Sequence, residues 1–156
     1  MIRFFAQGEP RGQPRARAFA RNGMVRMYDP ATAEGWKSCI AAAAREYLPS
    51  TPLRGPLHVD ITFYFPRPKS HYFSGGRANV LRPNAPTYHA KKPDRDNCDK
   101  AVLDAQTTLG MWQDDAQVVS GTIVKKFADN QPGAWIFIEE MELEAQGSGD
   151  GKFNNG

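Results

Sequence analysis

Aspartate is concentrated in one short window of this chain. Six of the ten aspartates fall between residues 94 and 115, and that window contains no glutamate. Carboxylates brought close together repel one another, so a fold that gathers several of them normally neutralises them with a divalent cation, a neighbouring base or raised pKa values. The window therefore predicts a Mg²⁺ site that faces phosphate. Such a site requires the end of the window to fold back toward its beginning.

Two basic stretches accompany this acidic window. Residues 1–28 carry six arginines against one acid, Glu9, and residues 67–92 carry six lysines and arginines with no acid. In an enzyme that cleaves phosphodiesters, cations hold the polyanionic substrate while carboxylates hold the metal. The alternative is that these stretches are merely solvated. The hypothesised phosphate contacts are Arg11, Arg15, Arg17, Lys91 and Lys92.

Length and composition suit one small domain. A chain of 156 residues with 40% apolar residues can bury one core, so we expect a domain over residues 1–145 and a disordered polar tail over 146–156. There is no run of 18 apolar residues and no apolar signal-peptide segment, which predicts a soluble, cytoplasmic protein. Cys39 and Cys98 form no CxxC pair, so free thiols are expected rather than zinc ligands or a catalytic nucleophile.

The apolar pattern predicts strands at both ends of the chain and in its middle. Four segments have the pattern of strands: residues 2–6, 57–65, 118–127 and 134–143. The last two are expected to pair with each other in antiparallel fashion, because a turn signal joins them. A hairpin is expected between residues 16 and 28, around Asn22-Gly23.

Two helices and one long loop complete the expected fold. Helices are predicted over residues 31–47 and 94–109, the second with Asp96 or Asn97 as its N-cap and Gly110 as its stop. Residues 66–93 are proline-rich and aperiodic, so we expect a loop that contacts DNA and is poorly ordered without it. Its aromatic residues Tyr72, Phe73 and Tyr88 are candidates for stacking on bases. The order of elements predicts an α+β fold, a small mixed β-sheet with two main helices packed on it.

Helical spacing predicts which residues of the acidic window lie on the same side of a helix. In a helix that opens near Asp96, the residues Asp96, Lys100 and Asp104 share one face. Asp94 lies two residues earlier, so Asp94 and Asp96 could reach one ion as the chain turns into the helix. A short loop would return the two aspartates that end the window, and because neighbours on an extended chain point in opposite directions, only one of them is expected to be a ligand.

Each of these residues also has an ordinary structural explanation. An aspartate at a helix start can be an N-cap, Lys100 its salt-bridge partner, Asp104 a solvated residue, and a pair of aspartates before a strand a polar turn. These ordinary explanations are less convincing for all of the residues together than for each residue alone. A calcium-binding EF-hand is excluded, because Asp99 and Ala105 stand where that loop needs glycine and glutamate.

Residues 92–118 resemble the signature of RusA-type Holliday junction resolvases. The resemblance is carried by two motifs, Lys92-Pro-Asp94-Arg-Asp96-Asn97-x-x-Lys100-x-x-x-Asp104-Ala and Trp112-x-Asp114-Asp115-Ala-Gln-Val118. The segment Gly8-Glu-Pro-Arg-Gly-Gln-Pro-Arg-Ala-Arg also looks like the N-terminal pattern of phage members.

The resemblance implies a homodimeric endonuclease, dependent on Mg²⁺ or Mn²⁺, that resolves four-way DNA junctions by paired symmetrical nicks in recombination and repair and is encoded by a phage or prophage. By position, Asp94, Asp96 and Asp115 would bind metal and Lys100 would be the essential cation. Asp114, Asp104 and Asn97 would be accessory residues of this site. Two alternatives stay open: a nuclease acting on flaps or forks, and a non-catalytic junction-binding protein.

Overall fold

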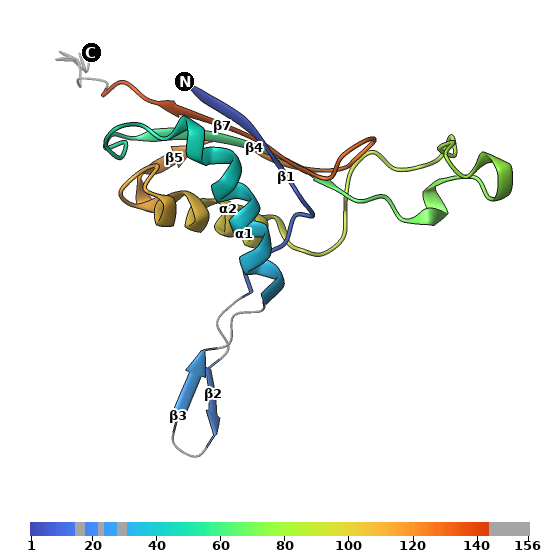
Figure 1. Ribbon diagram of the computed structural model, residues 1–156, viewed down its shortest axis with the longest axis horizontal. Helices are drawn as coiled ribbons and strands as arrows, with labels where there is room; N and C mark the ends of the chain where they lie inside the picture. The colour runs from blue at the N-terminus through green and yellow to red at the C-terminus, as the bar shows by residue number, and fades with distance from the viewer. Residues whose placement is uncertain (15–17, 22–23, 28–30, 144–156) are drawn as a thin grey trace, which may run out of the picture.

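The computed structural model describes residues 1–14, 18–21, 24–27 and 31–143, which form a mixed sheet, a separate hairpin and two helices (Figure 1). The expected α+β class, a small mixed sheet carrying two main helices, is confirmed. The sheet strands are β1 (Ile2–Gln7), β4 (Leu57–Phe65), β5 (Val118–Ser120), β6 (Ile123–Phe127) and β7 (Gly133–Glu140).

The expected hairpin is present as β2 (Ala18–Arg21) and β3 (Met24–Met27), which pair antiparallel and lie apart from the sheet in Figure 1. The Asn22-Gly23 turn predicted for it lies outside the described residues, as does the tail predicted over residues 146–156.

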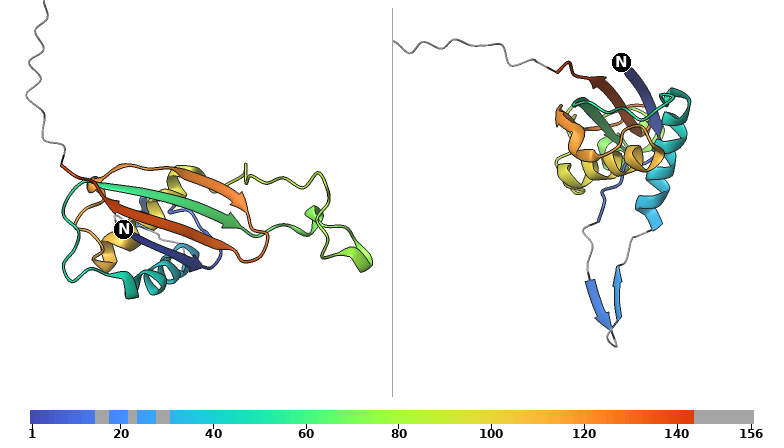
Figure 2. Two further views of the ribbon diagram at one scale, coloured as in Figure 1. Left: turned by 90° about the horizontal axis from the view of Figure 1, so that it is seen from above. Right: turned by 90° about the vertical axis from the view of Figure 1, so that its left-hand side faces the viewer.

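The longest strand, β4, occupies the middle of the sheet (Figure 2, left). Its nine residues alternate between buried and half-buried positions, as the sequence predicted. On one side it pairs antiparallel with β7, which in turn pairs with β1; on the other side it pairs parallel with β5 and β6. The expected antiparallel pairing of residues 118–127 with 134–143 is therefore wrong. Because β4 lies between β6 and β7, its backbone groups form hydrogen bonds along both edges. The turn after β6 therefore carries the chain across the end of β4 to its other side instead of closing a hairpin.

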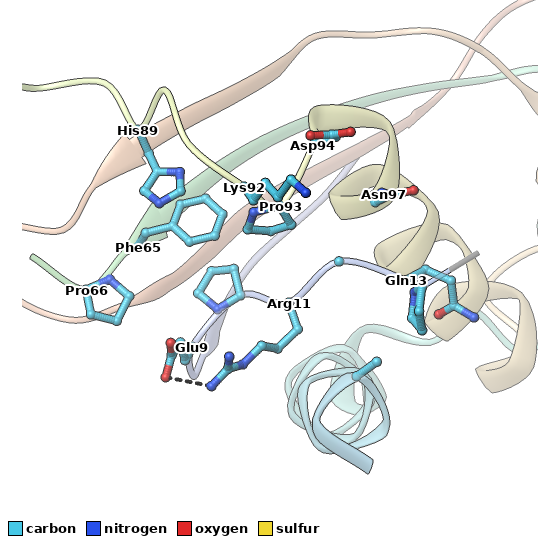
Figure 3. A pocket seen from close by; sticks show the side chains of 14 residues that line it. Glu9, Arg11, Gln13, Phe65, Pro66, His89, Lys92, Pro93, Asp94 and Asn97 are labelled. Atoms are coloured by element: carbon cyan, nitrogen blue, oxygen red, sulfur yellow. Dashed lines mark ion pairs between the residues drawn. The ribbon is translucent and has the colours of Figure 1, made fainter. Parts of the chain in front are cut away.

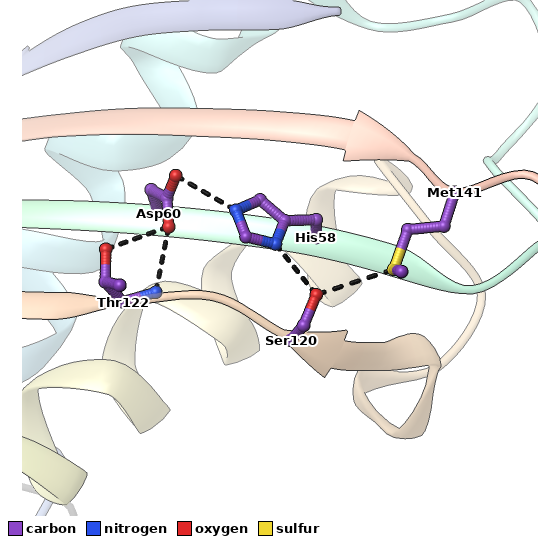
Figure 4. A network of polar contacts seen from close by, with 5 residues as sticks. All are labelled: His58, Asp60, Ser120, Thr122 and Met141. Carbon is purple, nitrogen blue, oxygen red and sulfur yellow. Dashed lines mark hydrogen bonds and ion pairs between the residues drawn. The ribbon is translucent and has the colours of Figure 1, made fainter.

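The segment predicted as one strand over residues 118–127 is broken in two at Gly121. This glycine has φ +142°, and a Cβ there would lie 1.8 Å from the carbonyl oxygen of Val59, so no side chain fits. The Asp60 carboxylate bridges the break: its Oδ1 accepts hydrogen bonds from the backbone N–H of Thr122 (2.8 Å) and from the Thr122 hydroxyl (2.9 Å). Figure 4 shows this carboxylate with His58, whose Nε2 lies 3.0 Å from Asp60 Oδ2.

Asp60 makes the stability of this junction depend on pH. Burial raises the pKa of the Asp60 carboxyl, but the hydrogen bonds from His58 and Thr122 outweigh burial, and the net shift is downward. A carboxyl whose pKa is lower in the folded chain stabilises the fold above its unfolded pKa, and that contribution is lost as the pH falls through the folded pKa.

We therefore expect Asp60→Asn to lower the urea midpoint at pH 7 by roughly 0.3 M, a small value because this partly exposed carboxylate is screened by solvent. As the pH falls below about 4, the wild type should lose stability faster than the variant, so that the two midpoints converge. Urea unfolding at several pH values measures both effects. Glu140→Gln, at an exposed position at the end of β7, is the control and should change neither. Parallel pH curves for Asp60→Asn and wild type would contradict this role.

Both helices lie on the same face of the sheet and bury the core against it (Figure 2). Helix α1 (Ala31–Ala44) continues as a 3₁₀ turn, Arg45–Tyr47, which together match the predicted span. Helix α2 (Arg95–Leu109) ends at Gly110, which has φ +89° and donates its N–H to the carbonyl oxygens of Gln106 and Thr107, so the predicted stop is confirmed. Among the buried helix residues are Trp36, Ile40 and Ala44 of α1 and Cys98, Ala101, Val102 and Ala105 of α2.

Residues 66–93 follow a path anchored by Arg67, while the expectation that they contact DNA and are poorly ordered without it stays a prediction. The Arg67 side chain is 6% exposed and donates to the carbonyl oxygen of Pro86 (2.6 Å) and to Asp129 (3.2 Å). Within the loop, the guanidinium groups of Arg77 and Arg82 lie 4.1 and 5.2 Å from the centre of the Phe73 ring. The Phe73 ring therefore packs the loop in this structure, while its predicted stacking on bases stays untested.

Candidate active site

The acidic window begins at the N-terminus of α2, where Asp94 is the N-cap. The N–H of Cys98 donates to the carbonyl oxygen of Asp94 (3.0 Å), which is the first bond of the helix, so the prediction of Asp96 or Asn97 as N-cap is wrong. The Asp94 carboxylate makes no capping hydrogen bond and is exposed. Asp96 lies in the first turn, and its Oδ1 accepts from the N–H of Asn97 (3.0 Å). Two exposed carboxylates therefore mark the start of α2.

The predicted helix face is present, and its members have different surroundings. Asp96 and Lys100 are both exposed and stand one helical turn apart. Asp104 lies a further turn along, and its Oδ2 is 3.6 Å from the Nζ of Lys37 in α1. Asp104 therefore joins α2 to α1, which favours a structural role for it.

The last two aspartates of the window point in different directions, as expected. Asp114 caps the 3₁₀ turn Asp115–Gln117: it accepts from the N–H of Ala116 (2.8 Å), while the Gln117 side chain accepts from the N–H of Asp114 (2.9 Å). Asp115 turns toward α2 instead.

Two donors hold Asp115 against the second half of α2. Its Oδ1 accepts a hydrogen bond from the hydroxyl of Thr107 and lies 3.3 Å from the indole nitrogen of Trp112. Thr107 follows Asp96 by eleven residues, which is about 16 Å along the helix axis at 1.5 Å per residue. Among residues 1–14, 18–21, 24–27 and 31–143, no three His, Cys, Asp or Glu side chains are grouped closely enough to hold a metal ion. The structure thus brings Asp94 and Asp96 to one end of α2 and Asp115 to another part of it, and the three-aspartate ligand set stays a prediction.

Asp99 is the acidic residue that the sequence analysis did not include in the site. It is half buried, and burial raises the pKa of its carboxyl, with the nearby Asp115 raising it further and Arg95 opposing the rise. The negative charge of Asp115 thus adds to burial in disfavouring the ionised form of the Asp99 carboxyl. The sequence shows Asp99 inside the acidic window, but its proximity to Asp115 depends on the path that the chain takes after Gly110.

A cavity of about 550 Å³ opens beside the start of α2 (Figure 3). Asp94 lies on its wall together with two cationic side chains, Arg11 and Lys92. The segment 9–14 crosses the helix start, where the N–H of Gln13 donates to the carbonyl oxygen of Asn97 (2.8 Å). A Cβ at Gly12 would lie 2.8 Å from the Cβ of Pro93, so glycine permits this close crossing.

The predicted phosphate contacts are distributed unevenly around this cavity. Arg11 and Lys92 line it, and Arg11 also pairs with Glu9 at 3.1 Å. Lys91 is exposed next to it, and its carbonyl oxygen accepts from the Nζ of Lys125 (2.6 Å). Arg15 and Arg17 lie outside the described residues. Cationic side chains and one carboxylate of the acidic window thus border the same hollow.

The two thiols should differ in reactivity. Burial raises the pKa of the Cys98 thiol to about 11, with Lys125 opposing the rise and Asp94, Asp96 and Asp99 adding to it. Relative to its ordinary pKa of 9.0, Cys98 therefore holds about a hundredfold less thiolate near neutral pH.

We expect Ellman's reagent to label one thiol of the native protein quickly, namely the half-buried Cys39, and the second at least about a hundredfold more slowly. Replacement of Cys39 by Ser should remove only the fast phase, and unfolding in urea should make the remaining thiol fast. Rapid labelling of the native Cys39→Ser variant would show that Cys98 is accessible and would reopen a chemical role for it.

A small α+β domain with exposed carboxylates and a lysine along one helix, beside a cavity lined by both cationic and acidic side chains, defines a class of proteins suited to act on a polyanion such as nucleic acid. A family model described as endodeoxyribonuclease RusA matches residues 7–139, so the chain belongs to the RusA family of endodeoxyribonucleases. A curated relative from Bacillus subtilis (strain 168), the uncharacterized protein YqaN, is 37% identical over 145 residues, covering 90% of this chain and 96% of that protein. None of the helices in the described parts of the chain is long and apolar enough to cross a membrane.

Proposed function

We propose that the protein is a metal-dependent endodeoxyribonuclease that resolves four-way DNA junctions by paired symmetrical nicks, as a homodimer serving DNA recombination and repair in the cytoplasm of a bacterial host. The observation that carries this proposal is the position of Asp94, which both begins the carboxylate-rich helix and lines a cavity that the cationic side chains of Arg11 and Lys92 also line. A phosphodiester bound by those cations would be brought against the carboxylates.

The donor set suits Mg²⁺, with Mn²⁺ as a possible substitute. Carboxylate oxygens are the ligands that these hard cations prefer, and the start of α2 offers two exposed carboxylates, Asp94 and Asp96. We propose Asp94, Asp96 and Asp115 as the residues that hold the metal. When bound, it would lower the pKa of an attacking water and neutralise charge on the phosphate.

The chain's own residues supply the remaining tasks. Arg11 and Lys92 bind phosphates next to the cleaved bond, and Lys100 orients the cleaved phosphate or stabilises the charge that develops on it. Asp104 and Asp114 position the framework, because one pairs with α1 and the other caps the turn that carries Asp115. Because Asp115 rests on Thr107, its arrival at the metal would require this turn to move toward the start of α2 when substrate binds.

A homodimer follows from the proposed substrate. A four-way junction offers two equivalent strands for cleavage, and a dimer with twofold symmetry offers two equivalent sites. Paired nicks at symmetrical positions are the expected product.

The test uses a four-way junction and the matching linear duplex, each labelled on one strand at a time. The purified protein is incubated with each substrate in Mg²⁺, in Mn²⁺ or in EDTA. Symmetrical nicks in the junction, lost in EDTA and absent from the duplex, are the expected result. Binding without metal-dependent cutting would favour the non-catalytic alternative, for which the structural contacts of Asp104 and Asp114 argue. Equal cutting of flaps, forks and junctions would favour a broader structure-specific nuclease.

A further inference from the structure

A second hollow lies in the 66–93 loop, which projects past the end of the sheet (Figure 1; Figure 2, left). This loop hollow has a volume of about 640 Å³. Its wall carries three cationic side chains and two serine hydroxyl groups, and no acidic residue of the described chain lines it. These five residues are Arg67, Lys69, Arg82, Ser70 and Ser74.

Backbone hydrogen bonds fold residues 71–82 into a short hairpin that forms one wall of the loop hollow. The N–H of Phe73 donates to the carbonyl oxygen of Val80 (3.0 Å), and the N–H of Arg82 donates to the carbonyl oxygen of His71 (2.9 Å). The loop hollow is therefore already formed, and little conformational freedom would be lost when a ligand binds there.

Two arginines of this hairpin are oriented by a single aromatic ring. The guanidinium groups of Arg77 and Arg82 lie 4.1 and 5.2 Å from the centre of the Phe73 ring. Arg82 is fixed further, because its Nε donates to the carbonyl oxygen of Tyr72 (3.0 Å), which leaves the two terminal nitrogens for a ligand. A guanidinium held in one orientation is suited to the paired hydrogen bonds that phosphate oxygens accept.

Acidic side chains do not balance the positive charge in this part of the loop. Within the described residues, no carboxylate forms an ion pair with Lys69, Arg77 or Arg82, whereas Arg67 pairs with Asp129. Lys69, Arg77 and Arg82 are all exposed. Like charges gathered in one place repel each other, and a bound anion lowers that repulsion. The loop hollow therefore favours an anionic ligand.

The loop hollow lies near the cavity that Asp94 lines. Pro66 lines that cavity, and the next residue, Arg67, lines the loop hollow. Lys69 follows Pro66 by three residues, a stretch of chain that spans at most about 11 Å. A phosphate in the loop hollow would therefore lie within roughly one turn of duplex, about 35 Å, of a phosphate held beside Asp94.

We propose that the loop hollow binds a backbone phosphate of one duplex arm of the DNA substrate, away from the phosphate that is cut. Arg82 binds the phosphate oxygens in a paired arrangement, and Lys69 adds a second positive charge. The hydroxyl groups of Ser70 and Ser74 are further donors, as is common in phosphate contacts. The inference rests on the proposed function, because it takes the substrate to be DNA held beside Asp94. The loop hollow thus contributes affinity and places the arm, and it takes no part in the cleavage chemistry.

The first test measures junction binding in EDTA over a range of salt concentrations. Arg82→Gln should reduce the slope of log affinity against log salt by about one unit and weaken binding about tenfold at roughly 0.1 M salt. Arg82→Lys keeps the charge, so it should retain the slope and lose only part of the affinity through its changed geometry.

Arg54→Gln is the matched control for the loss of one positive charge. Arg54 is exposed and precedes β4, whereas the 66–93 loop follows β4, and the nine residues of that strand span about 30 Å. The control variant should keep the wild-type slope and affinity.

The second test locates the bound phosphate. Single methylphosphonates, which carry no charge, replace phosphates one at a time over about ten nucleotides on either side of the branch point. At one position this replacement should weaken binding by wild type several-fold and change nothing further in Arg82→Gln. In a single turnover with Mg²⁺, Arg82→Gln should cut bound junction at the wild-type rate.

The outcomes separate this inference from the nuclease proposal. An unchanged salt slope in Arg82→Gln, an equal loss in Arg54→Gln, or the same response of wild type and Arg82→Gln to every methylphosphonate would overturn the inference alone. Slow cutting of bound junction by Arg82→Gln would also overturn it, because Arg82 would then act in cleavage. Wild-type binding without metal-dependent cutting would overturn the proposed function and leave the loop site standing. Failure of wild type to bind any junction would overturn both.

Discussion

Asp96→Asn should abolish cleavage of a four-way junction and leave binding of the junction intact. The substitution removes one negative charge from the start of α2 with almost no change in shape. The amide oxygen of asparagine can still accept the hydrogen bond that Asp96 Oδ1 accepts from the N–H of Asn97 at 3.0 Å. The helix start is therefore preserved, while a neutral amide binds a divalent cation much more weakly than a carboxylate does. The cleavage rate should fall on the order of 10³-fold or more.

Single-turnover cleavage in Mg²⁺ and gel-shift binding in EDTA measure the two effects separately. Asp104→Asn is the matched comparison on the same helix face, because Asp104 already pairs with Lys37 at 3.6 Å. This comparison variant should keep cleavage and lose a small amount of stability. Wild-type turnover in Asp96→Asn would remove Asp96 from the metal site, and equal losses in both variants would show that α2 needs its acidic face as a whole.

Local pattern explains which elements the sequence predicted well. The alternation along Leu57–Phe65 and the glycine after Leu109 depend on near neighbours in the chain, and both predictions are confirmed. The pairing of β6 and β7 does not depend on near neighbours, because β4 contributes the strand that lies between them. A turn signal indicates that the chain changes direction without showing which strand it will join.

The candidate site shows the same limit. The sequence identified the carboxylates of the window, yet their grouping depends on Gly110–Gln113, which directs the chain back along α2 and leaves Asp115 on Thr107. The cavity is harder to foresee because it combines four separate parts of the chain, residues 9–14, Ala33, residues 65–66 and residues 89–97. No periodicity links a histidine in a proline-rich loop to a phenylalanine at the end of a strand.

The position of Lys100 predicts a defect in cleavage that is separate from any defect in binding. Lys100 is exposed one turn after Asp96 on the same face of α2, so its ammonium can reach a phosphate held at the helix start. Lys100→Ala removes this charge without opening a core. Because the interaction with a phosphate grows as negative charge develops during cleavage, the single-turnover rate should fall about a hundredfold while junction affinity changes little.

The salt dependence of binding decides between a lysine that acts in cleavage and one that only docks DNA. A docking lysine contributes about one unit to the slope of log affinity against log salt, and its removal leaves the cleavage of bound junction unchanged. Lys69→Ala, an exposed lysine in the 66–93 loop, should behave in that way. Lys100→Ala should keep the slope and lose the rate, and Lys100→Arg should recover only part of it, since guanidinium keeps the charge but changes its geometry. A shallower slope with normal cleavage of bound junction would instead assign Lys100 to docking.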